Sequence, residues 1–305
     1  MRYVHHTGRA PSRQNRPSRF LPLLTLPTLL ILLTLLPSTP ALADTPAPPP
    51  TTGDLAAAGA EIYRGPAFDT CDAPDLDTMR AWLASPYRAV GVYIGGRGRG
   101  CPGQPHLTPD WVTAVHDLGW RLLPLYVGSQ SPCTRLPGTN RVPIDAERPR
   151  EQGAAEAQDA IAAAQALGLA PGSPIYLDME DYDHQDPGCA ATTLAFVQGF
   201  THRLDAAGFI PGYYSSATSG IAHLENARLA GTPDLPEVLW YARWSTEPTL
   251  HAEPALDPAA WQPDRRIHQY AGDVPETHGG RELLIDRNLV AAPVAVLADD
   301  HQGNP

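Results

Sequence analysis

The sequence predicts one α/β domain built as a closed (β/α)8 (TIM) barrel, and three observations lead to this prediction. Short β-type runs alternate with helical stretches along most of the chain. Eight such runs can be counted, which is the number of strands that closes a parallel barrel. The alternating part covers about 240 residues, close to the size of a single barrel of this kind.

The predicted elements follow one another in a regular order until the last part of the barrel. The strands are a run ending at 67–69, then 89–94, 121–127, 174–180, 210–215, 238–244, 266–270 and 283–286. The helices are 74–83, 109–118 (with Thr108 as its N-cap), 148–167 and 190–207. Closure is less regular, because only 258–261 looks helical between the sixth and seventh strands and 272–280 has the pattern of a plain loop.

The chain begins with the features of a secretory leader. Five arginines and no acid lie in the first 19 residues, and a leucine-rich apolar run covers 20–36. The small residues of Ala41-Leu42-Ala43 follow, in the pattern that signal peptidase recognises. We therefore expect a signal peptide at 1–43. The alternative is an uncleaved membrane anchor, which the two prolines inside the apolar run disfavour.

Composition divides the remainder into three parts. Residues 44–60 are rich in Pro, Thr and Ala and predict an extended linker. The barrel is expected at 61–298, and 299–305 should form a C-terminal tail.

The net charge of −11 excludes some classes of partner. Removal of the leader takes away five arginines and no acid, so the mature chain should carry a charge of about −16. We expect no nucleic-acid partner, no stable membrane association after signal cleavage, and a monomer.

Four cysteines, all in the exported part, predict two disulfides. Three pairings are possible. Each cysteine follows a different one of the first four strands, so adjacency favours Cys71 with Cys101 and Cys133 with Cys189. Metal ligation is the weaker alternative, because no pair has the close C-x-x-C spacing of zinc sites.

Carboxylates gather at the predicted strand ends. In the fourth strand Tyr176, Asp178 and Glu180 should share one face, because side chains alternate along a strand. Asp69 closes the first strand and Asp286 the last, and these two strands are neighbours in a closed barrel. Barrel active sites lie at this end of the strands. Capping or a salt bridge would account for any one of these acids alone.

Two carboxylates on one face repel each other, so the pKa of one of them should rise. That carboxyl group then stays protonated and can donate the proton that glycosidic cleavage requires. Glu180 is the candidate acid.

Aromatic and polar side chains near the same strand ends are candidates for substrate binding. Sugars bind by stacking their apolar faces on aromatic rings while polar groups contact the hydroxyls. For each aromatic residue, packing in the core is the competing interpretation. The candidates are Tyr93, Tyr126, Tyr176, Tyr214, Trp244, Arg243 and Gln269.

Other chemistries lack their motifs. The sequence has no H-E-x-x-H and no G-x-S-x-G, and the glycine-rich stretch 96–100 lacks the Lys-Ser/Thr of a phosphate loop and the spacing of a Rossmann motif. We expect no metal and no cofactor.

Six short stretches resemble, in their order, the glycoside-hydrolase-like domain of unknown function found in secreted actinobacterial proteins. They are 68–74 (FDTCDAP), 92–96 (VYIGG), 175–180 (IYLDME), 212–216 (GYYSS), 239–244 (LWYARW) and 285–288 (IDRN). That family is distantly similar to the family 25 lysozymes, barrels that hydrolyse peptidoglycan with an Asp-x-Glu on the fourth strand and acids on the first and last.

The resemblance implies the role of each acid. Glu180 would be the acid, Asp178 its partner, and Asp69 and Asp286 supporting carboxylates. Two departures matter: the lysozymes are not usually stapled by cysteines on these loops, and the domain family lacks an established substrate.

Residues and resemblance together predict a secreted glycoside hydrolase that acts on peptidoglycan or another cell-wall or extracellular polysaccharide. The alternative is a carbohydrate-binding barrel that keeps the acidic site without turnover.

Overall fold

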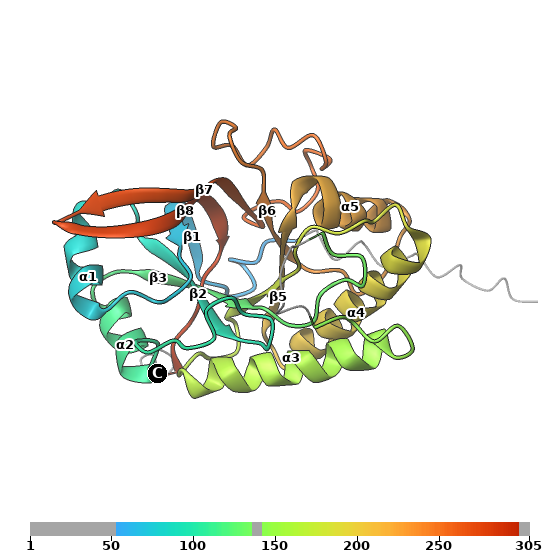
Figure 1. Ribbon diagram of the computed structural model, residues 1–305, viewed down its shortest axis with the longest axis horizontal. Coiled ribbons are helices and arrows are strands. Elements are labelled where there is room, and N and C mark those ends of the chain that lie inside the picture. Colours follow the sequence, from blue (N-terminus) through green and yellow to red (C-terminus); the bar gives the residue numbers. More distant parts are fainter. Residues whose placement is uncertain (1–52, 136–141, 299–305) are drawn as a thin grey trace, which may run out of the picture. The chain divides into compact units, whose positions relative to one another are not determined.

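The computed structural model describes residues 53–135 and 142–298, and within them eight strands form one closed barrel in the order β1 to β8 (Figure 1). The predicted α/β barrel is therefore confirmed. The predicted leader, the C-terminal tail and most of the predicted linker lie outside the described residues.

The elements have the following bounds. The strands are β1 (Ile62–Asp69), β2 (Ala89–Gly95), β3 (Arg121–Tyr126), β4 (Pro174–Asp178), β5 (Ile210–Ser216), β6 (Val238–Ala242), β7 (Arg266–His278) and β8 (Arg281–Pro293). The helices are α1 (Leu76–Ala81), α2 (Pro109–Asp117), α3 (Pro149–Ala166), α4 (Pro187–Asp205) and α5 (Ala222–Leu229). A 3-10 turn η1 (Trp82–Ala84) follows α1, and a π-helical turn η2 (Ala217–Ile221) precedes α5.

The last strand corrects the expectation of eight parallel strands. Strands β1 to β7 pair in parallel, but β8 runs antiparallel to both β7 and β1. The stretch predicted as a plain loop, 272–280, mostly belongs to β7, which returns through a tight turn into β8. Gly279 (φ 56°) and Gly280 (φ 78°) supply the two consecutive positive φ angles that such a hairpin turn favours.

The connection from β6 to β7 also differs from expectation. The predicted helix at 258–261 is a series of turns and bends, so no helix covers the barrel between these strands. Helices α2 and α4 begin where the sequence provides a cap: Thr108 accepts a hydrogen bond from Trp111 N–H, and Asp186 accepts one from Cys189 N–H.

Two apolar shells hold the barrel together. Tyr176, Leu125 and Trp240 belong to a cluster inside the barrel. Ile175 and Leu177 belong to a second cluster, in which side chains of the strands pack with those of the helices. The alternation predicted for the fourth strand is confirmed.

The β7–β8 hairpin continues beyond the barrel and lies over α1 (Figure 1). Trp82 Nε1 donates to the carbonyl of Arg281, and the Trp82 ring contacts His278 edge to face. The opposite face of the hairpin, which carries Asp286, is left for the open end of the barrel.

None of the helices in the part of the chain that the structure describes has the length and apolar character needed to cross a membrane.

Candidate active site

Asp69, Asp178, Glu180 and Asp286 come together at the open end of the barrel, and we call these four carboxyl groups the acidic site. Asp69 and Asp178 are the last residues of β1 and β4, and Glu180 follows two residues after β4. Asp286 lies within β8, directly opposite Asp69 in the antiparallel register. The sequence prediction that the first and last strands bring their acids together is therefore confirmed.

Asp69 is almost completely buried and accepts hydrogen bonds from three side chains. Asn288 Nδ2 donates to Oδ1 (2.7 Å), Gln269 Nε2 donates to Oδ1 (3.2 Å) and Tyr93 Oη donates to Oδ2 (3.2 Å). The orientation of the Asn288 amide is fixed, because Trp240 Nε1 donates to its Oδ1 (2.8 Å).

Gln269 connects the two opposed acids. Its Nε2 donates to Asp69 Oδ1 and to Asp286 Oδ2, each at 3.2 Å. Its Oε1 accepts from Tyr214 Oη (3.0 Å) and from Trp244 Nε1 (2.9 Å). Because an indole N–H can only donate, the amide has one orientation, and its N–H groups must face the carboxylates.

Asp178 has a different environment. Its side chain is buried, and its Oδ1 has no hydrogen-bond partner among the described residues. A buried ionised oxygen without a donor is costly, so this position favours the protonated acid. Glu180 is less buried than Asp178 and lies closer to solvent.

The pKa values of all four acids are raised. Burial and the charge of Asp286 raise the pKa of Asp69 to about 7, against the effect of its hydrogen bonds. Burial, followed by the charges of Glu180 and Asp69, raises the pKa of Asp178 well above its ordinary value.

Burial is also the main cause of the raised pKa values of the remaining two acids. Burial, followed by Asp181 and Asp286, raises the pKa of Glu180. Burial also raises the pKa of Asp286, and the hydrogen bond from Asp273 N–H opposes this effect. A site of this kind can hold at least one carboxylic acid protonated near neutral pH.

Four of the expected substrate contacts lie at the acidic site. Tyr93, Tyr214 and Gln269 contact its acids or each other. Trp244 is 48% exposed, and its ring packs against Gly272, where a Cβ would come within 2.2 Å of the indole. The Trp244 indole therefore offers a solvent-exposed aromatic surface at the acidic site.

The other three expected contacts do not reach the site. Tyr126 points into the outer shell, where its hydroxyl donates to Asp159 Oδ2 (2.8 Å). Tyr176 shares the face of Asp178 but is buried inside the barrel, and its hydroxyl donates to the Pro293 carbonyl (2.9 Å).

Arg243 is paired with Glu253 through Nε (2.6 Å) and Nη2 (2.5 Å). This pair lines a separate pocket of about 390 Å³ beside Tyr241 and His268. We therefore remove Tyr126, Tyr176 and Arg243 from the candidate substrate contacts.

Two residues of the site have no assigned role in the sequence prediction. Asn288 could have been found, because it lies two residues after Asp286 on the same strand and must share its face. Gln130, which contacts the main chain of Asp178 and Glu180, lies in a loop where no periodic pattern points to it.

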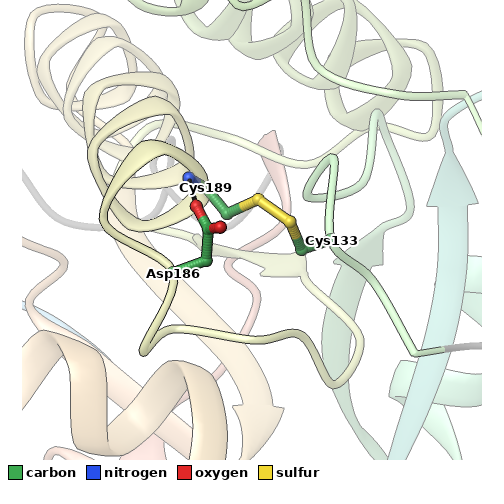
Figure 2. A group of neighbouring side chains, drawn as sticks. All are labelled: Cys133, Asp186 and Cys189. Carbon is green, nitrogen blue, oxygen red and sulfur yellow. Dashed lines mark hydrogen bonds between the residues drawn. A yellow bond between two sulfur atoms is a disulfide. The ribbon is translucent and has the colours of Figure 1, made fainter. Parts of the chain in front are cut away.

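Both predicted disulfides are present. Cys71 pairs with Cys101 and Cys133 with Cys189, with Cα atoms 5.7 and 5.9 Å apart. Figure 2 shows Cys133, Asp186 and Cys189, whose potential metal-ligand atoms lie together. The two sulfurs are bonded to each other, and Asp186 caps α4 by accepting from Cys189 N–H (2.9 Å), so each group has a structural role.

Comparison with known proteins gives a family and a fold. A family model described as an Rv2525c-like, glycoside hydrolase-like domain matches residues 80–290. The Tat-secreted protein Rv2525c of Mycobacterium tuberculosis, crystallised with HEPES, is similar with a TM-score of 0.50 and 15% identity, over 75% of this chain and 96% of that one.

The comparison also found two further solved structures. An uncharacterized protein of B. stearothermophilus has a TM-score of 0.48 and 17% identity, over 74% of this chain and 95% of its own. The modular autolysin LytC of Streptococcus pneumoniae has a TM-score of 0.48 and 15% identity, over 77% of this chain and 47% of its own. No curated protein matches the sequence.

Proposed function

Because this chain belongs to the Rv2525c-like, glycoside hydrolase-like domain family, we propose that it is a glycoside hydrolase acting on peptidoglycan or another cell-wall or extracellular polysaccharide. The observation that carries the proposal is the acidic site, in which four carboxyl groups with raised pKa values meet at the open end of the barrel. Glycosidic cleavage requires a carboxylic acid and a carboxylate at one site.

In this proposal Glu180 is the general acid. It is more exposed than Asp69 and Asp178, and burial raises its pKa, so a protonated carboxyl can reach a substrate oxygen. It gives its proton to the oxygen of the leaving sugar as the glycosidic bond breaks, and a water molecule supplies the hydroxyl that the anomeric carbon gains and returns a proton to the acidic site.

Asp69 and Asp286 support the positive charge that develops on the sugar ring. Asp69 is held by Asn288, Gln269 and Tyr93, all of which stabilise its ionised form. Gln269 holds Asp286 beside it. Asp178 is the partner of Glu180. Because its buried position favours the protonated form, its carboxyl group adds little negative charge to the site.

Trp244, Tyr93 and Tyr214 are the proposed substrate contacts. The exposed indole of Trp244 offers an apolar surface for a sugar ring. The Tyr93 hydroxyl donates to Asp69, and the Tyr214 hydroxyl donates to Gln269, the amide that bridges the two opposed acids. The partner is thus a glycan.

The proposal includes export. Two disulfides are typical of proteins that work in an oxidising compartment. The proposed boundaries are a signal peptide at 1–43, a linker at 44–60, the barrel at 61–298 and a tail at 299–305.

The test is the release of reducing ends from purified peptidoglycan and a panel of bacterial polysaccharides, by the mature protein and its Glu180→Gln variant. Release by the wild type and loss in the variant support a hydrolase with Glu180 at its centre. Absence of release by the wild type, with equal binding of a glycan by both proteins, would replace the hydrolase by a carbohydrate-binding barrel.

A further inference from the structure

The end of β4 lacks a main-chain neighbour on its β3 side. The two strands pair only at Leu125 with Tyr176 and at Tyr126 with Leu177, because β3 ends at Tyr126. On the other side, Met179 N–H donates to the Tyr214 carbonyl (3.0 Å) and continues the pairing with β5. The Asp178 carbonyl and the Glu180 N–H point the opposite way and need other partners.

The side chain of Gln130 supplies both partners. Its Nε2 donates to the Asp178 carbonyl (2.9 Å), and its Oε1 accepts from Glu180 N–H (2.8 Å). The primary amide therefore replaces the peptide group that a longer β3 would have placed there. Gln130 is 2% exposed, so these bonds are shielded from water.

Gln130 is itself held in place. Its N–H donates to the Val142 carbonyl (2.7 Å), and its carbonyl accepts from Ile144 N–H (2.9 Å). The next residue, Ser131, directs its N–H to Met179 Sδ (3.3 Å), and the Cys133–Cys189 disulfide follows two residues later. The main chain of Gln130 is thus held by its neighbours, so its side-chain amide can restrict the movement of the residues at the end of β4.

We propose that Gln130 is a positioning residue that fixes the Asp178 and Glu180 carboxyl groups relative to each other. It acts through the main chain, because its two side-chain bonds go to a carbonyl and an N–H on either side of Met179. The inference rests on the proposed function, since it names what aligns the general acid of that reaction. A displacement of about 1 Å in a catalytic group can lower a rate by roughly 100-fold.

The chain provides a matched control in Gln104. Its Oε1 accepts from Ala73 N–H (2.9 Å) and its Nε2 donates to the Cys71 carbonyl (2.7 Å), so it also bridges two main-chain groups two residues apart. None of the four acids belongs to the segment that it holds.

The experiment compares wild type, Gln130→Met and Gln104→Met on purified peptidoglycan, after circular dichroism has established folding. Methionine keeps the length of the side chain and removes both hydrogen bonds. For Gln130→Met we expect kcat to fall by roughly 100-fold with KM within about 3-fold, and the alkaline limb of the pH profile, where the general acid loses its proton, to move. Gln104→Met should keep kcat within about 3-fold of the wild type.

A second measurement does not depend on turnover. Carbon-13 NMR of the Glu180 carboxyl and hydrogen exchange of the Glu180 amide should both change in Gln130→Met, with exchange faster by roughly 10-fold or more, and should stay as in the wild type in Gln104→Met. If the wild type releases no reducing ends, the proposed function fails, and this measurement still decides the role of Gln130.

Unchanged kcat, pH profile and Glu180 pKa in Gln130→Met would overturn the proposal. If Gln130→Met does not fold, Gln130→Asn is used, since it keeps a neutral amide but is one methylene too short to reach both the Asp178 carbonyl and the Glu180 N–H. A Glu180 amide that stays protected in Gln130→Asn, with a Glu180 pKa equal to that of the wild type, would contradict the proposal equally.

Discussion

Asp69 and Asp178 are both buried acids at strand ends, yet their surroundings are opposite. Asp69 receives three donors, whereas Asp178 Oδ1 receives none among the described residues. Donors stabilise the ionised form and burial without donors favours the neutral one. A proton shared within the acidic site should therefore reside more on the Asp178 and Glu180 side, where the proposed reaction needs it.

The raised pKa of Asp69 has a consequence for stability. Its folded pKa of about 7 lies above the ordinary value of 3.8, so the stabilising contribution is present at low pH and is lost as the pH rises through about 7. We expect the unfolding free energy of the wild type to decrease from pH 5 to pH 8, and the Asp69→Asn variant to show a shallower slope by up to about 1 kcal/mol per pH unit.

Urea unfolding at a series of pH values measures this slope. Asp77→Asn, which removes an exposed acid on α1, is the control. Equal slopes in wild type and Asp69→Asn would show that Asp69 titrates alike in the folded and unfolded chains.

The elements show how far the sequence predicts the site. Alternation placed Tyr176, Asp178 and Glu180 on one face of β4, and neighbouring strands brought Asp69 to Asp286. The same parity would have excluded Tyr126 and Arg243, because Leu125 and Trp240 on their strands face the interior. Tyr176 points to the barrel interior as predicted, but it lies too deep to reach the acidic site. Its depth depends on how side chains are layered within the barrel, which alternation along one strand does not predict.

The β7–β8 hairpin could not be predicted from local pattern. Residues 272–280 are polar and contain three glycines, which is typical of a loop. They form a strand because one face packs on distant parts of the chain: His278 contacts Trp82, and Glu276 accepts from Tyr87 Oη (2.8 Å). Tertiary contacts override local preference here.

The Cys133–Cys189 disulfide joins the loop that carries Gln130 to the start of α4. Its closed loop spans 56 residues, so the bond should restrict the unfolded chain strongly. We expect the Cys133→Ala/Cys189→Ala double variant to lose about 2–4 kcal/mol of unfolding free energy. Denaturant unfolding measures the loss, and an unchanged midpoint would contradict a stabilising role.

At the scale of the whole molecule, the central prediction is that the protein is exported and processed. The predicted cleavage before Asp44 would leave a mature chain with a charge of about −16. Expression in an actinobacterial host and mass spectrometry of the culture medium should give a chain that starts at Asp44. A cell-bound protein with an intact N-terminus would favour the membrane-anchor alternative instead.

Closure of the sheet creates the acidic site, because it pairs β8 with β1 and brings Asp286 beside Asp69. Because β8 is antiparallel, Asp286 reaches the open end from within a strand, where the N–H of Asp273 on β7 donates to its carboxylate. The proposed function then depends on whether Glu180 donates its proton to the oxygen of the leaving sugar.

The most direct measurement of that claim compares wild type and Glu180→Gln on two substrates with the same sugar, a natural oligosaccharide and an aryl glycoside with a nitrophenol leaving group. A general acid is needed for the sugar leaving group and much less for nitrophenol. We expect the variant to lose roughly 100- to 10,000-fold on the oligosaccharide and far less on the aryl glycoside. Equal losses on both substrates would contradict the assignment of Glu180 as the proton donor.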